Sequence, residues 1–300
     1  MDRKQIELYD LIEKINLENI LLREKIKKNK INKIKNFIRD PLNTIIIKSS
    51  MRKITFHYNH DNDFSVYNIE LLKNKIPRIA VYTCITGNYD SVCDPFIKFD
   101  NIDFYLFTNN DKIKSKIWMV KKIDKNIEKK YDNIKLNRYY KFHPFDFFSP
   151  NDYDYVIYID GNIQVVSNLT TLTYVVSDKT GLALHNHCMR KDVYEEAKAC
   201  CIFKKGNQKK IRNQINRYKK EKFPNDFGLF ECNVIVSDLK NKAAQKIFDF
   251  WWNDFIVSES NRDQLSFPYT LWKLKYCKDD IGILGKNVYH NPKLRFNNHN

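Results

Sequence analysis

The chain has 300 residues, of which 43% are hydrophobic and 14% aromatic, so it can bury the core of one large domain. Glycine and proline number only 7 and 8, which excludes collagen-like and low-complexity proteins. The net charge of +16 would favour a nucleic-acid partner, but two runs, 23–39 and 204–222, carry +15 of it. We therefore expect no nucleic acid, and we expect the two runs to face an anionic membrane, a phosphorylated substrate or water.

The cysteines and the amino terminus bear on the cellular compartment. Seven cysteines form an odd set without a CxxC pair, which is untypical of structural disulfides and of zinc sites. The first ten residues are polar and acidic, unlike a signal peptide, and no apolar run reaches the length of a membrane span. These features predict a reduced, cytoplasmic protein, and the basic runs allow it to contact a membrane peripherally.

Residues 1–53 predict a helical arm, and residues 54–77 predict a connecting segment. Within the arm, spacings of four and three residues alternate as in the seam of a coiled coil. The residues on this seam are Leu8, Ile12, Ile15, Asn19, Leu22, Ile26 and Asn29. The pattern predicts either a homodimer through a coiled coil or one amphipathic helix packed on the domain. Pro41 is expected to end the helix.

Residues 78–300 predict a single α/β domain with a Rossmann-like, mixed central sheet, because short apolar runs alternate with longer helical stretches. The expected strands are 79–85, 104–108, 117–123, 155–159, 182–185 and 234–237. The expected helices are 127–142, 191–220, 240–256 and 262–275.

The first expected strand runs into a glycine turn that suits a nucleotide. In an open α/β sheet, ligands bind beyond the carboxyl ends of the strands, so this turn is a candidate nucleotide site. Any α/β domain contains such a turn, and a plain connection is the alternative. The candidate binding residues are Thr83, Gly87, Asn88, Tyr89 and Asp90.

The strand at 155–159 delivers Asp160, Gly161 and Asn162 at its end. A carboxylate and an amide oxygen on either side of a small glycine can hold a hard divalent cation and leave coordination positions for the phosphates of a nucleotide sugar. The alternative is a turn in which both side chains bond their own backbone. His290 is a candidate third metal ligand, and a surface histidine is its alternative.

Basic side chains near this turn could hold phosphates or the base of the nucleotide. Those immediately upstream are Arg138, Lys141 and His143, and solvated helix ends are the alternative. Arg190 is a candidate for binding an acceptor or a phosphate. The nearby histidines His185 and His187 lack a third ligand at suitable spacing, so we do not expect a zinc site there.

Two further carboxylates are candidates for the catalytic chemistry. Glu231 and Asp263 could deprotonate an acceptor hydroxyl or stabilise an oxocarbenium-like centre. Asp263 is the preferred candidate, although it lies in the first turn of an expected helix, where a structural role near the helix dipole is the alternative.

Taken in order, these segments resemble a known family, the glycosyltransferase-like domain of plant seed-mucilage hexosyltransferase relatives and of bacterial and viral surface-glycan proteins. The matching segments span residues 78 to about 275 and are TGNYD, FTNN, RYYKFHP, YIDGNI, HNHCMR with DVYEEA, QINRYKKEKFPNDFGLFE, FWWNDF and RDQLSFPY. The resemblance implies a GT-A fold, a nucleotide-sugar donor and dependence on a divalent metal, Mn²⁺ or alternatively Mg²⁺.

The resemblance also implies roles for single residues. Asp160 and Asn162 correspond to the family's metal-binding turn, and Asp263 with Gln264 resembles an acidic-Gln motif that faces the sugar in many GT-A enzymes. The matched segments add Asn109 for the donor, and Arg262 and Gln264 for the acceptor or a phosphate.

We therefore expect a metal-dependent hexosyltransferase that moves a sugar from a nucleotide diphosphate, with UDP as the expected nucleotide, to a glycan, glycolipid or protein acceptor. A glycan hydrolase that uses paired carboxylates and water is one alternative. A non-catalytic scaffold that forms a coiled coil or binds nucleic acid is another.

Overall fold

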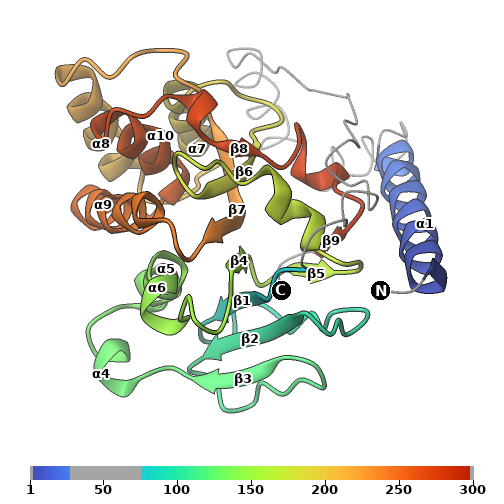
Figure 1. The fold of residues 1–300 in the computed structure, drawn as a ribbon. Coiled ribbons are helices and arrows are strands. Elements are labelled where there is room, and N and C mark those ends of the chain that lie inside the picture. The colour runs from blue at the N-terminus through green and yellow to red at the C-terminus, as the bar shows by residue number, and fades with distance from the viewer. Residues whose placement is uncertain (1–2, 28–75, 298–300) are drawn as a thin grey trace, which may run out of the picture.

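The computed structural model describes residues 3–27 and 76–297 (Figure 1). The expected helix end at Pro41 lies outside these ranges, as do most of the connecting segment and most of the first basic run. The domain boundaries derived from the sequence stay predictions.

One mixed sheet organises the described part of the chain, in the order β3-β2-β1-β4-β7-β6-β8 (Figure 1). Strands β1 to β4 run parallel, whereas β7 runs antiparallel to both of its neighbours, β4 and β6. Every residue of β1 is buried, as expected for a strand that is covered on both faces of the sheet. The strands are β1 (Ile79–Ile85), β2 (Ile102–Thr108), β3 (Met119–Lys122), β4 (Tyr155–Ile159), β6 (Leu182–Asn186), β7 (Phe230–Asp238) and β8 (Gly282–Ile283).

A second, two-stranded sheet ties the carboxyl-terminal segment to the chain that follows β4. It pairs β5 (Ile163–Val165) with β9 (Leu294–Phe296) in antiparallel fashion. Since β5 begins directly after the turn formed by Asp160, Gly161 and Asn162, this pairing brings residues 294–297 close to that turn.

Helices cover both faces of the large sheet. On one face, aromatic side chains of the strands pack with those of the helices, such as Tyr82 and Tyr158 with Trp251 and Phe255. The other face packs against 3-10 turns and the amino-terminal helix. The helices after β1 are α4 (Lys125–Glu128), α5 (Asn133–Phe142), α6 (Pro144–Phe147), α7 (Val193–Ile202), α8 (Gln208–Lys220), α9 (Lys242–Ser258) and α10 (Asp263–Lys273), with the 3-10 turns η3 (Thr170–Val175), η4 (Lys278–Asp280) and η5 (Val288–His290).

The single helix expected over 191–220 is wrong, because the chain forms α7 and α8 with a turn between them. Lys204 and Gly206 have φ angles of 53° and 73°, which an α-helix cannot accommodate. A Cβ atom on Gly206 would lie 2.6 Å from the Ser260 carbonyl oxygen, so this close approach requires glycine. The helix expected over 127–142 is likewise divided, into α4 and α5.

The amino-terminal arm contains one long helix, α1 (Arg3–Lys27), which lies beside β9 and η5 (Figure 1). Its packed side is polar: the Asn16 side chain donates to the carbonyl oxygens of Pro292 and Leu294, at 2.8 and 3.0 Å. The buried Glu13 carboxylate pairs with the ammonium of Lys293 at 2.5 Å. The structure therefore matches the expectation of a helix packed on the domain.

Three apolar residues of the expected coiled-coil seam of α1 face solvent, and Ile12 is partly buried; the side chains of Ile26 and Asn29 lie outside the described residues. The exposed apolar residues of the seam are Leu8, Ile15 and Leu22, with exposed fractions of 49%, 50% and 55%. A homodimer through this face stays a prediction.

The fold class expected from the sequence is confirmed, since a mixed α/β sheet domain carries an added amino-terminal helix. None of the helices in the described ranges combines the length and the apolarity needed to cross a bilayer.

Candidate active site

A pocket of about 240 Å³ opens where β4 and β6 end and β7 begins. Because β7 is antiparallel to its neighbours, its first residues lie at the same edge of the sheet as the last residues of β4 and β6. The pocket brings together residues that are far apart in the sequence. The predicted site residues that line it are Arg138, Lys141, Asp160, Asn162, Arg190, Glu231, Arg262, Asp263 and Gln264.

The turn after β4 presents oxygen atoms to this pocket. The Tyr158 hydroxyl donates to Asp160 Oδ1 at 2.9 Å, which leaves Oδ2 for a ligand. The Asn162 amide nitrogen donates to the Asn297 carbonyl at 3.0 Å, so its side-chain oxygen is also left for a ligand. A Cβ atom on Gly161 would lie 3.1 Å from Asp90 Oδ2, so glycine allows a second carboxylate, besides that of Asp160, to approach the turn. Such a set of oxygen donors fits a hard divalent cation.

Asp263 is held by two cations from α5. The Lys141 ammonium lies 2.5 Å from Asp263 Oδ2, and the Arg138 Nε atom lies 3.2 Å from the same oxygen. Burial alone would raise the pKa of Asp263, but Arg138 and Lys141 outweigh burial and hold this pKa well below its usual range. Asp263 therefore stays ionised and is a poor acceptor for a proton at neutral pH.

Glu231 has the opposite environment. Burial disfavours its charged form and the nearby Glu196 carboxylate adds repulsion, so the pKa of Glu231 is raised to about 7. The Gln264 amide donates to Glu231 Oε2 at 3.1 Å and to the Phe230 carbonyl at 2.9 Å, which fixes the orientation of the carboxyl group. A carboxyl group with a pKa near 7 can both accept and release a proton under physiological conditions.

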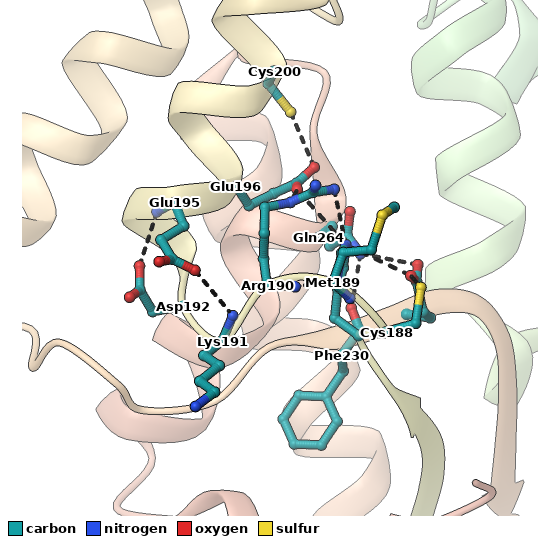
Figure 2. Close-up of polar contacts among 12 residues, drawn as sticks. Cys188, Met189, Arg190, Lys191, Asp192, Glu195, Glu196, Cys200, Phe230 and Gln264 are labelled. Atoms are coloured by element: carbon teal, nitrogen blue, oxygen red, sulfur yellow. Dashed lines mark hydrogen bonds and ion pairs between the residues drawn. The ribbon is translucent and has the colours of Figure 1, made fainter. Parts of the chain in front are cut away.

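Glu196 anchors the basic side of the pocket (Figure 2). It accepts a hydrogen bond from Arg190 Nε, and the Arg262 guanidinium lies 3.4 Å from its other oxygen. The Asp192 side chain caps α7 by accepting from the backbone amides of residues 194 and 195, so the start of this helix, and with it Glu196, is fixed. Both arginines are thereby held at the pocket wall.

A second group of potential metal ligands, His187, Cys188 and Glu231, lies nearby, with ligand atoms within 4.8 Å of one another. His187 Nδ1 accepts from two backbone amides, those of Met189 and Arg190, at 3.0 Å each, so this nitrogen is engaged within the protein. Burial and Glu231 raise the pKa of the Cys188 thiol to about 12, which keeps the thiol protonated. The turn after β4, with oxygen donors alone, suits a hard divalent cation better than this mixed set of donors.

Comparison with known proteins assigns the chain to a family. The family model of the TOD1/MUCI70 glycosyltransferase-like domain matches residues 47–291. The chain belongs to this family. The match confirms the resemblance inferred from the ordered motifs, and it identifies the chain as a glycosyltransferase-like protein. A search of curated proteins found no match to the chain.

Solved structures with distant similarity include three glycosyltransferases. The apo form of GlyE from Streptococcus pneumoniae TIGR4 is 14% identical, with 69% of this chain and 44% of that chain covered and a TM-score of 0.38. The galactosyltransferase LgtC with donor and acceptor sugar analogues is 14% identical, with 66% and 72% covered and a TM-score of 0.39. Apo mouse xyloside xylosyltransferase 1 is 7% identical, with 69% and 84% covered and a TM-score of 0.39. Similarity this low carries no inference about donor or acceptor.

In this TOD1/MUCI70 family member, the donor-binding residues expected within and after β1 and after β2 lie outside the lining of the pocket, unlike Arg138, Lys141 and Asp160. Gly87 has a φ angle of 60°, and its amide donates to Asn109 Oδ1 at 2.8 Å. Asn88 Oδ1 accepts from Asn110 at 2.9 Å, and Tyr89 is 66% exposed. Thr83 is buried within β1, and its hydroxyl has no hydrogen-bond partner among the described residues.

Two predicted histidines do not reach the pocket. His143 ends α5, where its ring stacks on Tyr139 with centroids 4.1 Å apart and its Nδ1 atom bonds the Tyr139 carbonyl. His290 lies in η5, which faces α1, and its Nε2 atom lies 2.7 Å from Glu24 Oε1. This arrangement does not bring His290 to the Asp160 turn as a third metal ligand.

The pocket also contains side chains that the sequence did not single out as site residues. Glu196, His187, Lys205, Asn233 and Tyr289 all line it. Of these, only Asn233 could have been predicted from a local pattern, because residues 231 and 233 of a strand point to the same face as each other. The others depend on how α7, its following turn and the carboxyl-terminal segment fold over the sheet.

Replacing Asp263 by Asn leaves the buried Lys141 ammonium without its counterion. We expect the free energy of unfolding at pH 7 to fall by about 3 kcal/mol, because breaking a buried ion pair exposes an uncompensated charge. Urea unfolding measures this difference. The pKa of Asp263 is lower in the folded state than its unfolded value of about 3.9, so the ion pair contributes its full stability only above that pH. The difference in stability between Asp263→Asn and the wild type should therefore shrink as the pH falls below about 3.9.

Asp279→Asn, at an exposed residue, is the matched control and should leave stability unchanged. Equal stability of Asp263→Asn and the wild type at neutral pH would contradict the ion-pair account.

Proposed function

We propose that this protein transfers a hexose from a nucleotide diphosphate sugar, with UDP as the nucleotide, to a hydroxyl group of a glycan, glycolipid or protein. The observation that supports this most strongly is that Asp160 and Asn162 open into the same pocket as Glu231. One wall of the pocket thus suits a cation and a diphosphate, and the other suits a hydroxyl group that must lose a proton.

The proposed metal is Mn²⁺ or Mg²⁺, held by Asp160 Oδ2 and the Asn162 amide oxygen. When bound, such a cation neutralises the negative charge that develops on the leaving diphosphate. The turn offers one carboxylate where two would bind more tightly, so we expect the cation and the diphosphate to bind together rather than the cation alone.

The basic side chains of the pocket complete the proposed diphosphate site. Lys205 is exposed, lines the pocket and forms no ion pair with any described residue, so its charge is available to an anion. Arg262 is held in place by Glu196 and can share the same phosphate oxygens. Lys141 is only 1% exposed and is committed to Asp263, so its role is to position that carboxylate.

Glu231 is the proposed general base. In the transfer step, the acceptor oxygen bonds to the anomeric carbon, the bond from that carbon to the phosphate oxygen breaks, and the hydroxyl proton passes to Glu231. The carboxylate accepts this proton most readily when its pKa lies near the working pH, which is the condition that burial creates here.

Replacing Asp160 by Ala should remove the proposed donor and metal site together. A bound donor raises the melting temperature by an amount that grows with the logarithm of its concentration over the dissociation constant, on the order of 5 °C at a hundredfold excess. We expect UDP with Mn²⁺ to produce such a shift in the wild type and no shift in Asp160→Ala. Differential scanning fluorimetry measures both.

Asp152→Ala removes an exposed carboxylate near the opposite end of β4 and is the matched control. An equal shift in Asp160→Ala would remove the metal assignment. Sugar release at the same rate without any acceptor, and without an effect of UDP, would favour the hydrolase alternative.

Replacing Glu231 by Gln should change the pH dependence of transfer. A general base acts only when ionised, so kcat/KM of the wild type should rise with pH until about 7 and then level off. The variant should lose this rise and about 10²-fold to 10⁴-fold of the rate. Steady-state kinetics across the pH range measures both effects.

Glu195→Gln, a neighbouring partly exposed carboxyl group, should keep the profile of the wild type. A rise near pH 7 that persists in Glu231→Gln would exclude Glu231 as the base, provided that the variant still binds UDP with Mn²⁺.

A further inference from the structure

A groove separates α7 from α8, on the side of the molecule away from α1 (Figure 1). Its volume is about 430 Å³, and its lining is mainly apolar. We call it the α7–α8 groove. The apolar side chains that line it are Ala197, Cys201, Ile202, Ile211 and Ile215.

Cations surround this apolar floor. Lys198, Arg212 and Lys219, here called the rim cations, all line the groove and are exposed. None of the three forms an ion pair with a residue that the structure describes, and no carboxylate lines the groove. The groove therefore combines an apolar interior with a positive rim.

The sequence of α8 explains this combination. Ile211 and Ile215 are one helical turn apart and share the face toward α7, whereas Gln214 and Tyr218 are buried on the other side against α9 and α10. Two of the nine basic residues of the run 204–222 form ion pairs, Lys210 with Glu259 at the surface and Arg217 with the buried Asp254. The other seven are exposed and have no ion-pair partner in the described ranges.

We propose that the α7–α8 face docks on a membrane surface that contains anionic phospholipids. The rim cations would bind lipid phosphates, and the groove would take up part of an acyl chain. Clusters of four to eight Lys and Arg residues on an amphipathic helix are typical of surfaces that bind anionic lipids. A nucleic acid would use the positive charge but would gain little from a mainly aliphatic groove, whose one aromatic ring, that of Tyr194, is partly buried and already in contact with Lys219.

This contact would hold the candidate active site beside the bilayer. Glu196 on α7 lines the catalytic pocket, and Lys198, two residues later, lines the groove. Lys205, in the turn between α7 and α8, lines the catalytic pocket as well. If the proposed transferase function holds, the acceptor belongs to the class of lipid-borne molecules, and this last step alone rests on that function.

Co-sedimentation of the full chain with vesicles tests the membrane contact. At physiological ionic strength we expect binding to vesicles of phosphatidylcholine mixed with phosphatidylglycerol and no binding to phosphatidylcholine alone. The triple variant K198E/R212E/K219E should bind the anionic vesicles roughly a hundredfold more weakly, since each charge near the surface contributes to attraction. Ile215→Gln should also weaken binding, because it removes apolar contact within the groove.

A charge-matched control reverses three exposed lysines between β2 and β3, as K112E/K114E/K116E, and should bind as the wild type does. Binding that survives in the groove variant but is lost in K28E/K30E/K33E, within the first basic run, would overturn the proposal. Absence of binding to anionic vesicles, or retention of RNA in its place, would also overturn it. Vesicle binding by a wild type that shows no thermal shift with UDP and Mn²⁺ would support the membrane contact and contradict only the proposed function.

Discussion

Strand β7 runs antiparallel between β4 and β6, and the candidate site depends on this reversal. Glu231, at the beginning of β7, meets the ends of its neighbours, so it lines one pocket with the Asp160 turn. A parallel strand would carry its first residues to the opposite edge of the sheet. The small sheet of β5 and β9 then brings Asn297 to the side chain of Asn162, which closes the turn from outside.

The surroundings of two buried carboxyl groups in this pocket shift their pKa values in opposite directions. Asp263 forms ion pairs with Arg138 and Lys141 and stays ionised. Glu231 is buried and lies near the Glu196 carboxylate, so it is about half protonated near neutral pH. When two carboxyl groups in one site have such different pKa values, one provides a permanent negative charge and the other can exchange protons. The preference for Asp263 as the catalytic carboxylate, drawn from the sequence, therefore shifts toward Glu231, with Asp263 as part of the scaffold that positions α5 against α10.

The sequence predicted what local patterns encode. The apolar runs specified the strands of the central sheet, and the Asp160 turn was recognisable because oxygen-bearing side chains follow such a run directly. Contacts between distant segments have no local pattern, so neither the pairing of Lys141 with Asp263 nor the position of His290 against α1 could be predicted. In α1 the helix was predicted correctly, but its packed side was not, because that side uses polar groups such as Asn16.

We propose that the turn after β4 holds a cation that binds the diphosphate of the sugar donor. X-ray data collected at the manganese absorption edge, from crystals grown with UDP and Mn²⁺, test it directly. We expect an anomalous peak at coordination distance from the Asp160 carboxylate and the Asn162 amide oxygen, with the diphosphate on its far side. A peak among His187, Cys188 and Glu231, or bound UDP without a peak at the turn, would contradict it.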